Sequence, residues 1–104
     1  MYASYRDLET KIIQWSEARR IIPKSTVVHQ FMKGTSEWGE LADAILKNDK
    51  DKIVDSVGDV MVCLINACAL ADIDLVQCMA RAYEEIKDRR GTLLPNGVFV
   101  KEGA

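Results

Sequence analysis

Residues 57–71 read VGDVMVCLINACALA, which is the longest nearly apolar run in the sequence. Asp59 and Asn66 are its clearly polar members, and every other residue is Val, Met, Leu, Ile, Ala, Cys or Gly. We therefore predict a helix over about residues 52–71 that is buried nearly all round. The stretch is too short to span a bilayer comfortably and carries the charge of Asp59, so we expect no membrane contact.

The segments on either side are also predicted to be helical. Apolar residues recur at helical spacing over about 4–20 and 25–46, and a further helix is expected over about 75–90. Pro23 interrupts the first pair, with Ser25 as the expected N-cap of the helix that follows it. Short loops between successive helices predict antiparallel neighbours.

The boundaries of the last helix and the tail follow from turn residues. Asp74 is the expected N-cap, and Gly91 is expected to end the helix. Residues 92–100 read as two short extended pieces around a Pro-Asn-Gly turn. We predict one all-α domain over residues 1–104, a four-helix antiparallel bundle-like fold with a short C-terminal extended hairpin.

Two glycines lie inside the helix predicted over 25–46. Gly34 and Gly39 each disfavour a helix by about 1 kcal/mol relative to Ala. Their presence suggests a close approach of a second helix at these positions.

Composition narrows the function classes. The 104 residues carry 14 Lys+Arg and 16 Asp+Glu, a net charge of −2, so the chain offers no excess positive field for nucleic acid. Three cysteines without a CxxC pattern argue against a disulfide framework or a zinc site of the usual spacing. With the polar start MYASYRDLET, they favour a cytoplasmic protein.

Two acidic pairs on consecutive predicted helices are the candidate chemistry. Glu37 and Glu40 are spaced i,i+3, and Asp55 and Asp59 are spaced i,i+4, so each pair shares a helix face. Asp55, Asp59 and Asn66 fall within about 40° of one another around their helix and form a narrow polar stripe. Asn66 is therefore also a candidate substrate contact.

The carboxylates allow two interpretations. In the first, Glu37 and Glu40 form a solvated edge and Asp59 is the buried ion-pair partner of an arginine. In the second, the antiparallel helices bring the pairs face to face as oxygen ligands of Mg²⁺ or Mn²⁺, which would take up substrate phosphate.

Several further residues could hold a nucleotide. Tyr83, Lys87 and Arg90 form one stripe near the end of the last helix, where basic residues also favour the helix dipole. Lys33, one turn before Glu37, either contacts phosphate or simply pairs within its helix. Trp15 and Trp38 either stack on a base or pack in the core.

The sequence resembles the MazG-like nucleoside triphosphate pyrophosphohydrolases of the all-α NTP pyrophosphatase superfamily, most closely the short single-domain forms of phages and mobile elements. The segments that carry this resemblance are QFMK at 30–33, EWGELA at 37–42, DSVGDV at 55–60, EIKDRRG at 85–91 and NGVFVKE at 96–102. The family pattern is ExxE, a spacer and ExxD. Glu37, Glu40 and Asp59 match it.

The resemblance implies Mg²⁺-dependent hydrolysis of a nucleoside triphosphate to a monophosphate and pyrophosphate, in nucleotide-pool house-cleaning. It implies Mg²⁺ ligation by the three matching carboxylates, phosphate contacts from Lys87 and Arg90, and a homodimer or homotetramer. As the general base we favour Glu40 over Glu37.

Two positions depart from the family pattern. Ser36 and Ser56 stand where the family often has glutamate, so the fourth carboxylate ligand would have to be Asp55. The alternative is a catalytically impaired helical module that binds a nucleotide or a partner protein.

Overall fold

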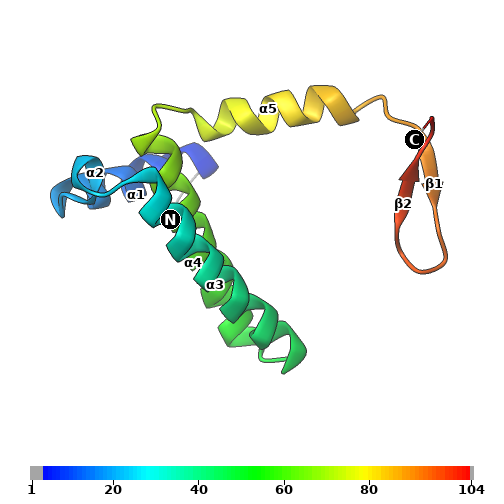
Figure 1. Ribbon diagram of the computed structural model, residues 1–104, viewed down its shortest axis with the longest axis horizontal. Coiled ribbons are helices and arrows are strands. Elements are labelled where there is room, and N and C mark those ends of the chain that lie inside the picture. Colours follow the sequence, from blue (N-terminus) through cyan, green and yellow to red (C-terminus); the bar gives the residue numbers. More distant parts are fainter. Residues whose placement is uncertain (1–3, 104) are drawn as a thin grey trace.

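The computed structural model describes residues 4–103 and is all-α apart from one hairpin (Figure 1). The predicted domain of residues 1–104 therefore has its extreme ends, 1–3 and 104, outside the described residues. The elements are α1 (Tyr5–Ala18), α2 (Ile21–Lys24), α3 (Val27–Leu46), α4 (Lys50–Leu70), α5 (Leu75–Ile86), β1 (Gly91–Leu93) and β2 (Phe99–Lys101).

The centre of the structure is the antiparallel pair α3 and α4, which run side by side over most of their length (Figure 1). The turn between them contains Asn48 in the left-handed region, with φ of 54°. Asp49 then caps α4, its carboxylate accepting a hydrogen bond from the backbone N–H of Lys52 at 3.2 Å. A tight polar turn thus sets the antiparallel course predicted from the short loop.

The two glycines of α3 differ in their surroundings. A Cβ on Gly34 would lie 3.3 Å from the Cβ of Cys63 on α4, so the helices do approach closely there. A Cβ on Gly39 would meet nothing within 4 Å. The expectation of close approach is therefore confirmed at Gly34 and wrong at Gly39.

A buried polar chain ties α1 and α3 to α4. The hydroxyl of Ser16 donates to the Asn66 side-chain oxygen at 2.6 Å, and the Asn66 amide donates to the Gln30 side-chain oxygen at 3.3 Å. Ser16 and Asn66 are both buried. One asparagine therefore links three helices, and its amide is hydrogen-bonded on both sides, as a buried polar group requires.

The fourth long helix does not complete a bundle. α5 leaves the end of α4, packs along no other helix of the described residues, and carries the β1–β2 hairpin at its far end (Figure 1). The radius of gyration is 16.5 Å, against about 13 Å for a compact chain of this length. The all-α class and the C-terminal hairpin are confirmed, whereas the arrangement within one chain is a helical body with a projecting arm.

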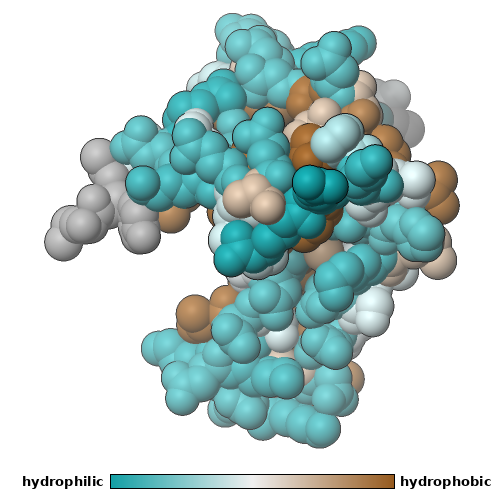
Figure 2. All heavy atoms as spheres, turned by 90° about the vertical axis from the view of Figure 1, so that its left-hand side faces the viewer, coloured by the Kyte–Doolittle hydropathy of each residue, from teal (hydrophilic) through white to brown (hydrophobic). Residues whose placement is uncertain are grey.

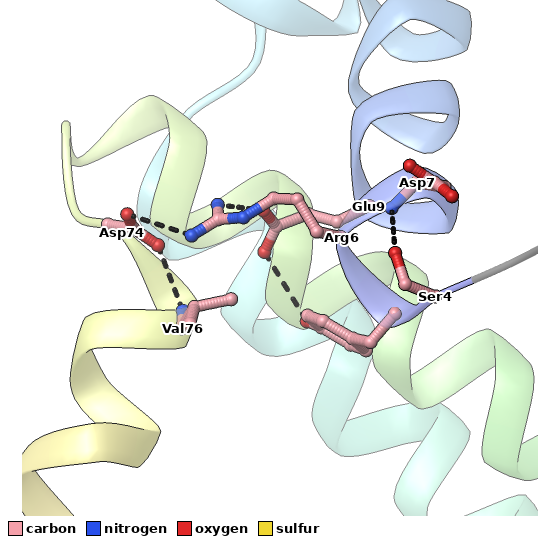
Figure 3. A network of polar contacts seen from close by, with 7 residues as sticks. Ser4, Arg6, Asp7, Glu9, Asp74 and Val76 are labelled. Carbon is pink, nitrogen blue, oxygen red and sulfur yellow. Dashed lines mark hydrogen bonds and ion pairs between the residues drawn. The ribbon is translucent and has the colours of Figure 1, made fainter.

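Polar contacts at the start of α5 fix the direction of this arm (Figure 3). One Asp74 oxygen accepts from the backbone N–H of Val76 at 2.9 Å, which confirms the predicted cap. The other accepts from the Arg6 guanidinium at 3.2 Å, and Arg6 also pairs with buried Glu9 at 2.6 Å. The arm is thereby anchored to α1.

Some predicted boundaries need correction. α3 is capped by Thr26 rather than Ser25, because the Thr26 hydroxyl accepts from the backbone N–H of His29 at 3.0 Å. α5 ends at Ile86, earlier than predicted, and Gly91 begins β1 instead of ending the helix. The carbonyl of Val100 lies where a side chain on Gly91 would stand, which explains glycine at that position.

The prediction that α4 is buried nearly all round is wrong for the single chain. Ser56, Cys63, Ile65 and Asn66 are buried, but Val54, Val57 and Leu64 are exposed. Among the described helices, α4 is also the one long and apolar enough to cross a membrane by length and composition alone. The exposed apolar side chains of α4, namely Val54, Val57 and Leu64, therefore need a physical explanation.

Candidate functional site

Glu37 is the centre of the candidate site. It lies near the middle of α3 with its side chain only 16% exposed, and one of its carboxylate oxygens, Oε1, pairs with the ammonium of Lys33 at 3.7 Å. The other carboxylate oxygen of Glu37, Oε2, is buried and has no hydrogen-bond donor. An ionised oxygen without a partner in a buried position is unfavourable, which marks this position as one that a cation would stabilise.

The surroundings of Glu37 are negative. Its pKa is raised above the ordinary value, first because its protonated carboxyl can donate a hydrogen bond to Glu40, then because of desolvation, and then through the charges of Glu40 and Asp59. Lys33 acts in the opposite direction. The negative charges of Glu40, on the same helix, and of Asp59, on α4, therefore both act on Glu37.

Glu37, Glu40 and Asp59 have the oxygen donors that a metal ion requires, but their side chains do not converge on one point. Oxygen donors and an unsatisfied buried carboxylate are what Mg²⁺ takes as ligands. Within residues 4–103, however, no three acidic, histidine or cysteine side chains converge closely enough to hold an ion as they stand. Glu37 and Glu40 would provide the first ligands, and the exposed side chain of Asp59 would have to turn toward them.

Asp55 and Asp59 border an open cleft between α1 and α4. One part of the cleft, about 510 Å³, contains both aspartates, and an adjoining part of about 420 Å³ contains Asp59, Trp15 and Lys11. Apolar side chains shared by the two parts form the floor: Leu8, Ile12 and Val62. This apolar floor beside carboxylates is suited to a ligand that has one apolar end and one charged end.

Trp15 is at the rim of this cleft and is 46% exposed, so core packing does not explain it within the chain. Lys11, one turn earlier on α1, is the cleft residue that the sequence analysis missed. Lys11 and Trp15 are spaced i,i+4 and therefore lie on one face of α1. This spacing could have indicated Lys11 as a second residue of the site from the sequence.

The predicted phosphate contacts of the last helix are not brought to the carboxylates of the same chain. Tyr83 and Lys87 lie on or at the end of α5, and Arg90 follows on the arm that projects from the body (Figure 1). The ammonium of Lys87 instead pairs with Glu84 of its own helix at 2.7 Å.

The burial and contacts of three other residues bear on their predicted roles. Asn66 is buried and hydrogen-bonded within the protein, which argues against its predicted role in substrate binding. Ser56, at the position of the missing glutamate, is also buried. Trp38 is exposed and lines an apolar groove between α3 and α4.

A family model described as MazG nucleotide pyrophosphohydrolase domain matches residues 29–93, which is more than half of the chain and includes both acidic pairs. This chain belongs to that family. The resemblance of its motifs to MazG-like enzymes is thereby confirmed. All of α1, with Trp15 and Lys11, lies before the matched region, so one wall of the cleft is outside it.

A phage protein is among the relatives of this MazG-family chain. It is the "Uncharacterized 18.2 kDa protein in rep-hol intergenic region" of Haemophilus phage HP1 (strain HP1c1), 38% identical over 74 residues. The match covers 71% of this chain and 45% of the phage protein, so the chain spans less than half of that relative's length. No solved structure matches the chain.

Proposed function

We propose that this protein hydrolyses a nucleoside triphosphate to a monophosphate and pyrophosphate with Mg²⁺, or Mn²⁺, at Glu37, Glu40, Asp59 and Asp55. The observation that carries the proposal is the buried, donor-free oxygen of Glu37 among other carboxylates on a MazG-family helix pair. A metal, when bound, supplies positive charge that offsets that of the triphosphate.

One of the carboxylates would also act as the general base of the reaction. Glu40 is the exposed member of its pair and is the proposed general base, with Glu37 as the second candidate. Glu40 takes a proton from water, the water oxygen bonds to phosphorus at the α–β bridge, and the bridging P–O bond breaks. The electron pair of that bond leaves with the pyrophosphate, whose charge Lys33, which lies beside Glu37, would offset.

The cleft between α1 and α4 is the proposed site of the base and sugar. Trp15 would stack on the base above the apolar floor, while Asp59 at the edge of the cleft connects it to the carboxylates. The second ring, Trp38, lines a different cavity from the one that contains Trp15 and Asp59. The structure therefore favours Trp15 over Trp38 as the stacking residue.

Lys87, Arg90 and Tyr83 have a role in this scheme only through a second copy of the chain. Their arm projects from the body, so we propose that they contact phosphates bound to another protomer of a homodimer or homotetramer. Nucleotide-pool house-cleaning in the cytoplasm is the proposed setting, with no role for nucleic acid or a membrane.

The test is release of pyrophosphate from a panel of ribo- and deoxyribonucleoside triphosphates with Mg²⁺ or Mn²⁺. We expect equal amounts of monophosphate and pyrophosphate, and a loss of about 10²–10⁴-fold in kcat for Glu40→Gln. Glu85→Gln, on the arm, is the control. Nucleotide binding without turnover by any metal would instead support the impaired binding module.

A further inference from the structure

Trp15 and Arg19 form a close pair at the C-terminal end of α1. The Arg19 guanidinium lies over the Trp15 indole, with its carbon 4.2 Å from the ring centroid. The same guanidinium donates a hydrogen bond to the backbone carbonyl of Trp15 at 3.3 Å. A cation over the face of a tryptophan is attracted by the electrons of the ring, so this contact restrains the indole as well as the arginine.

The cleft lies on the other side of the indole from Arg19. Side chains of a helix lean toward its N-terminus, so the side chain of Arg19 reaches back onto Trp15 from the C-terminal side. The residues of α1 that line this part of the cleft together with Trp15 all precede it: Leu8, Lys11 and Ile12. Arg19 therefore covers one side of the ring, and a ligand in the cleft would meet the other.

Arg19 gives an exposed ring a fixed orientation. The outer surface at the α1 and α2 end of the molecule is mostly hydrophilic, with apolar residues exposed only in smaller patches (Figure 2). Trp15 is exposed at the rim of the cleft rather than packed in the core, so the surrounding side chains restrain it only in part. A ring that is already held loses less conformational freedom when a ligand stacks on it.

Arg19 also caps α1. Its backbone N–H donates to the carbonyl of Trp15 at 3.3 Å, and a positive charge at a helix C-terminus is favoured by the helix dipole. Capping requires the charge and the hydrogen bonds, but it does not require the guanidinium to lie over the indole. The position over the ring therefore indicates a second role.

We propose that Arg19 is a positioning residue for nucleotide binding, which holds the Trp15 indole so that its open side stacks on the base in the cleft. The proposal rests on the proposed function for the identity of the ligand, but not on hydrolysis of that ligand. Arg19 itself does not contact the nucleotide. A polyphosphate without a base therefore gains nothing from Arg19.

Calorimetric titration tests this in a Glu40→Gln background, which lacks the proposed general base, with Mg²⁺ present. The probes are ATP, GTP, CTP and UTP, together with inorganic tripolyphosphate, which has the phosphates but no base. Arg19→Ala should raise the dissociation constants of the nucleotides roughly two- to fivefold and leave that of tripolyphosphate unchanged. Arg19→Lys keeps the charge and should lie between the two. Lys24→Ala, which removes an exposed charge from α2, is the control and should change neither.

Fluorescence provides a second measurement that does not depend on turnover. In a Trp38→Phe background Trp15 is the one remaining tryptophan of the chain. Nucleotides should quench its emission, whereas tripolyphosphate should not. In the protein without ligand, Arg19→Ala should make this emission more easily quenched by acrylamide, because the ring is then covered and restrained less.

Several results would overturn the proposal. Equal weakening of nucleotides and tripolyphosphate by Arg19→Ala would mean that the charge of Arg19 attracts phosphate. A lower melting temperature with unchanged nucleotide binding would mean that Arg19 only caps α1. An absence of nucleotide binding would overturn both this role and the proposed function. By contrast, the expected binding pattern without any pyrophosphate release by the native protein would support the role of Arg19 and refute the hydrolysis.

Discussion

At the scale of single residues, two polar side chains in similar positions differ in how they are satisfied. Asn66 is buried and its amide both accepts and donates a hydrogen bond within the protein. Glu37 has a buried oxygen without a donor, next to carboxylates of the same charge. A satisfied buried group stabilises a fold, whereas an unsatisfied one indicates that something else is to bind there.

Glu37→Gln should raise the melting temperature of the metal-free protein at neutral pH by a few degrees. The neutral amide removes the repulsion from Glu40 and Asp59, and the lost contact with exposed Lys33 is worth little. We expect Mg²⁺ to raise the melting temperature of the native protein, and the same substitution should abolish that rise. Scanning calorimetry with and without Mg²⁺ measures both effects, with Glu85→Gln as the control. Equal stabilisation by Mg²⁺ in both proteins would show that Glu37 is not a ligand.

Asn66→Ala should lower the free energy of unfolding by about 1–3 kcal/mol, because Ser16 and Gln30 both lose a buried partner. Ser16→Ala should also destabilise, and the double variant should lose less than the sum of the two. Urea unfolding of all four proteins gives this coupling. Simple additivity would mean that the 2.6 Å contact between Ser16 and Asn66 contributes nothing of its own.

At the scale of elements, the α3–α4 pair has two different sides. On α3, Trp38 directly follows Glu37 and so is turned by about 100° from it, which separates the groove from the carboxylates. The pair holds together through close contact where Gly34 meets Cys63, and through a capped turn at its far end. One helical hairpin thus provides a chemical surface and an apolar one.

The two glycines of α3 make a matched pair. Gly39→Ala should stabilise the protein by about 1 kcal/mol, because alanine is the better helix former and its Cβ meets nothing. Gly34→Ala should stabilise less or destabilise, because its Cβ would be 3.3 Å from that of Cys63 and would press α3 away from α4. Urea unfolding compares them. A larger gain at Gly34 than at Gly39 would contradict the close packing described for Gly34.

The anchor of α5 predicts a pH dependence. The pKa of Asp74 is lowered, first because Arg6 donates a hydrogen bond to its carboxylate, with a further contribution from the backbone N–H of Val76. A lowered pKa in the folded state contributes stability above about pH 3.9, and that stability is lost as the pH falls through the lowered value. Asp74→Asn should therefore be less stable than the native protein at pH 7, and the difference should shrink toward pH 3.

Urea unfolding over this pH range measures the difference, and Asp88→Asn on the arm is the control. A difference between native protein and Asp74→Asn that stays constant from pH 7 to pH 3 would rule out the ion pair as its source.

At the scale of the whole molecule, sequence periodicity predicted the helices well because each has an apolar face of regular spacing. It could not predict that α5 would project. The apolar face of an amphipathic helix indicates that something covers that face, but it does not indicate whether the cover comes from the same chain or from another molecule. The burial of α4 was overestimated for the same reason. At the site, carboxylate spacing made Glu37, Glu40 and Asp59 candidates, and their role as ligands stays a prediction. The cleft beside Asp59 depends on how α1 packs, which spacing along the sequence does not show.

Mixing two defective variants tests whether the arm serves a second copy's site. Glu40→Gln removes the proposed base, and Lys87→Ala combined with Arg90→Ala removes the proposed phosphate contacts. If the cations act across copies, equal mixing after exchange of subunits should restore roughly a quarter of the native rate, because half of the dimers then contain one intact site. Pyrophosphate release before and after mixing measures it. No recovery, with exchange shown by mass spectrometry, would place both functions in one chain or remove the cations from the scheme.

The exposed apolar side chains of this chain, such as Val54 and Leu64, also affect how its free energy of unfolding has to be measured. A fold whose apolar surfaces are completed by another molecule gains free energy with concentration, as any protein does that binds a ligand. Dilution then lowers the stability of the fold. A melting temperature of such a protein can be interpreted only together with the protein concentration at which it was measured. If a second copy completes this chain, as we propose, the stability of the α3–α4 pair depends on the protein concentration.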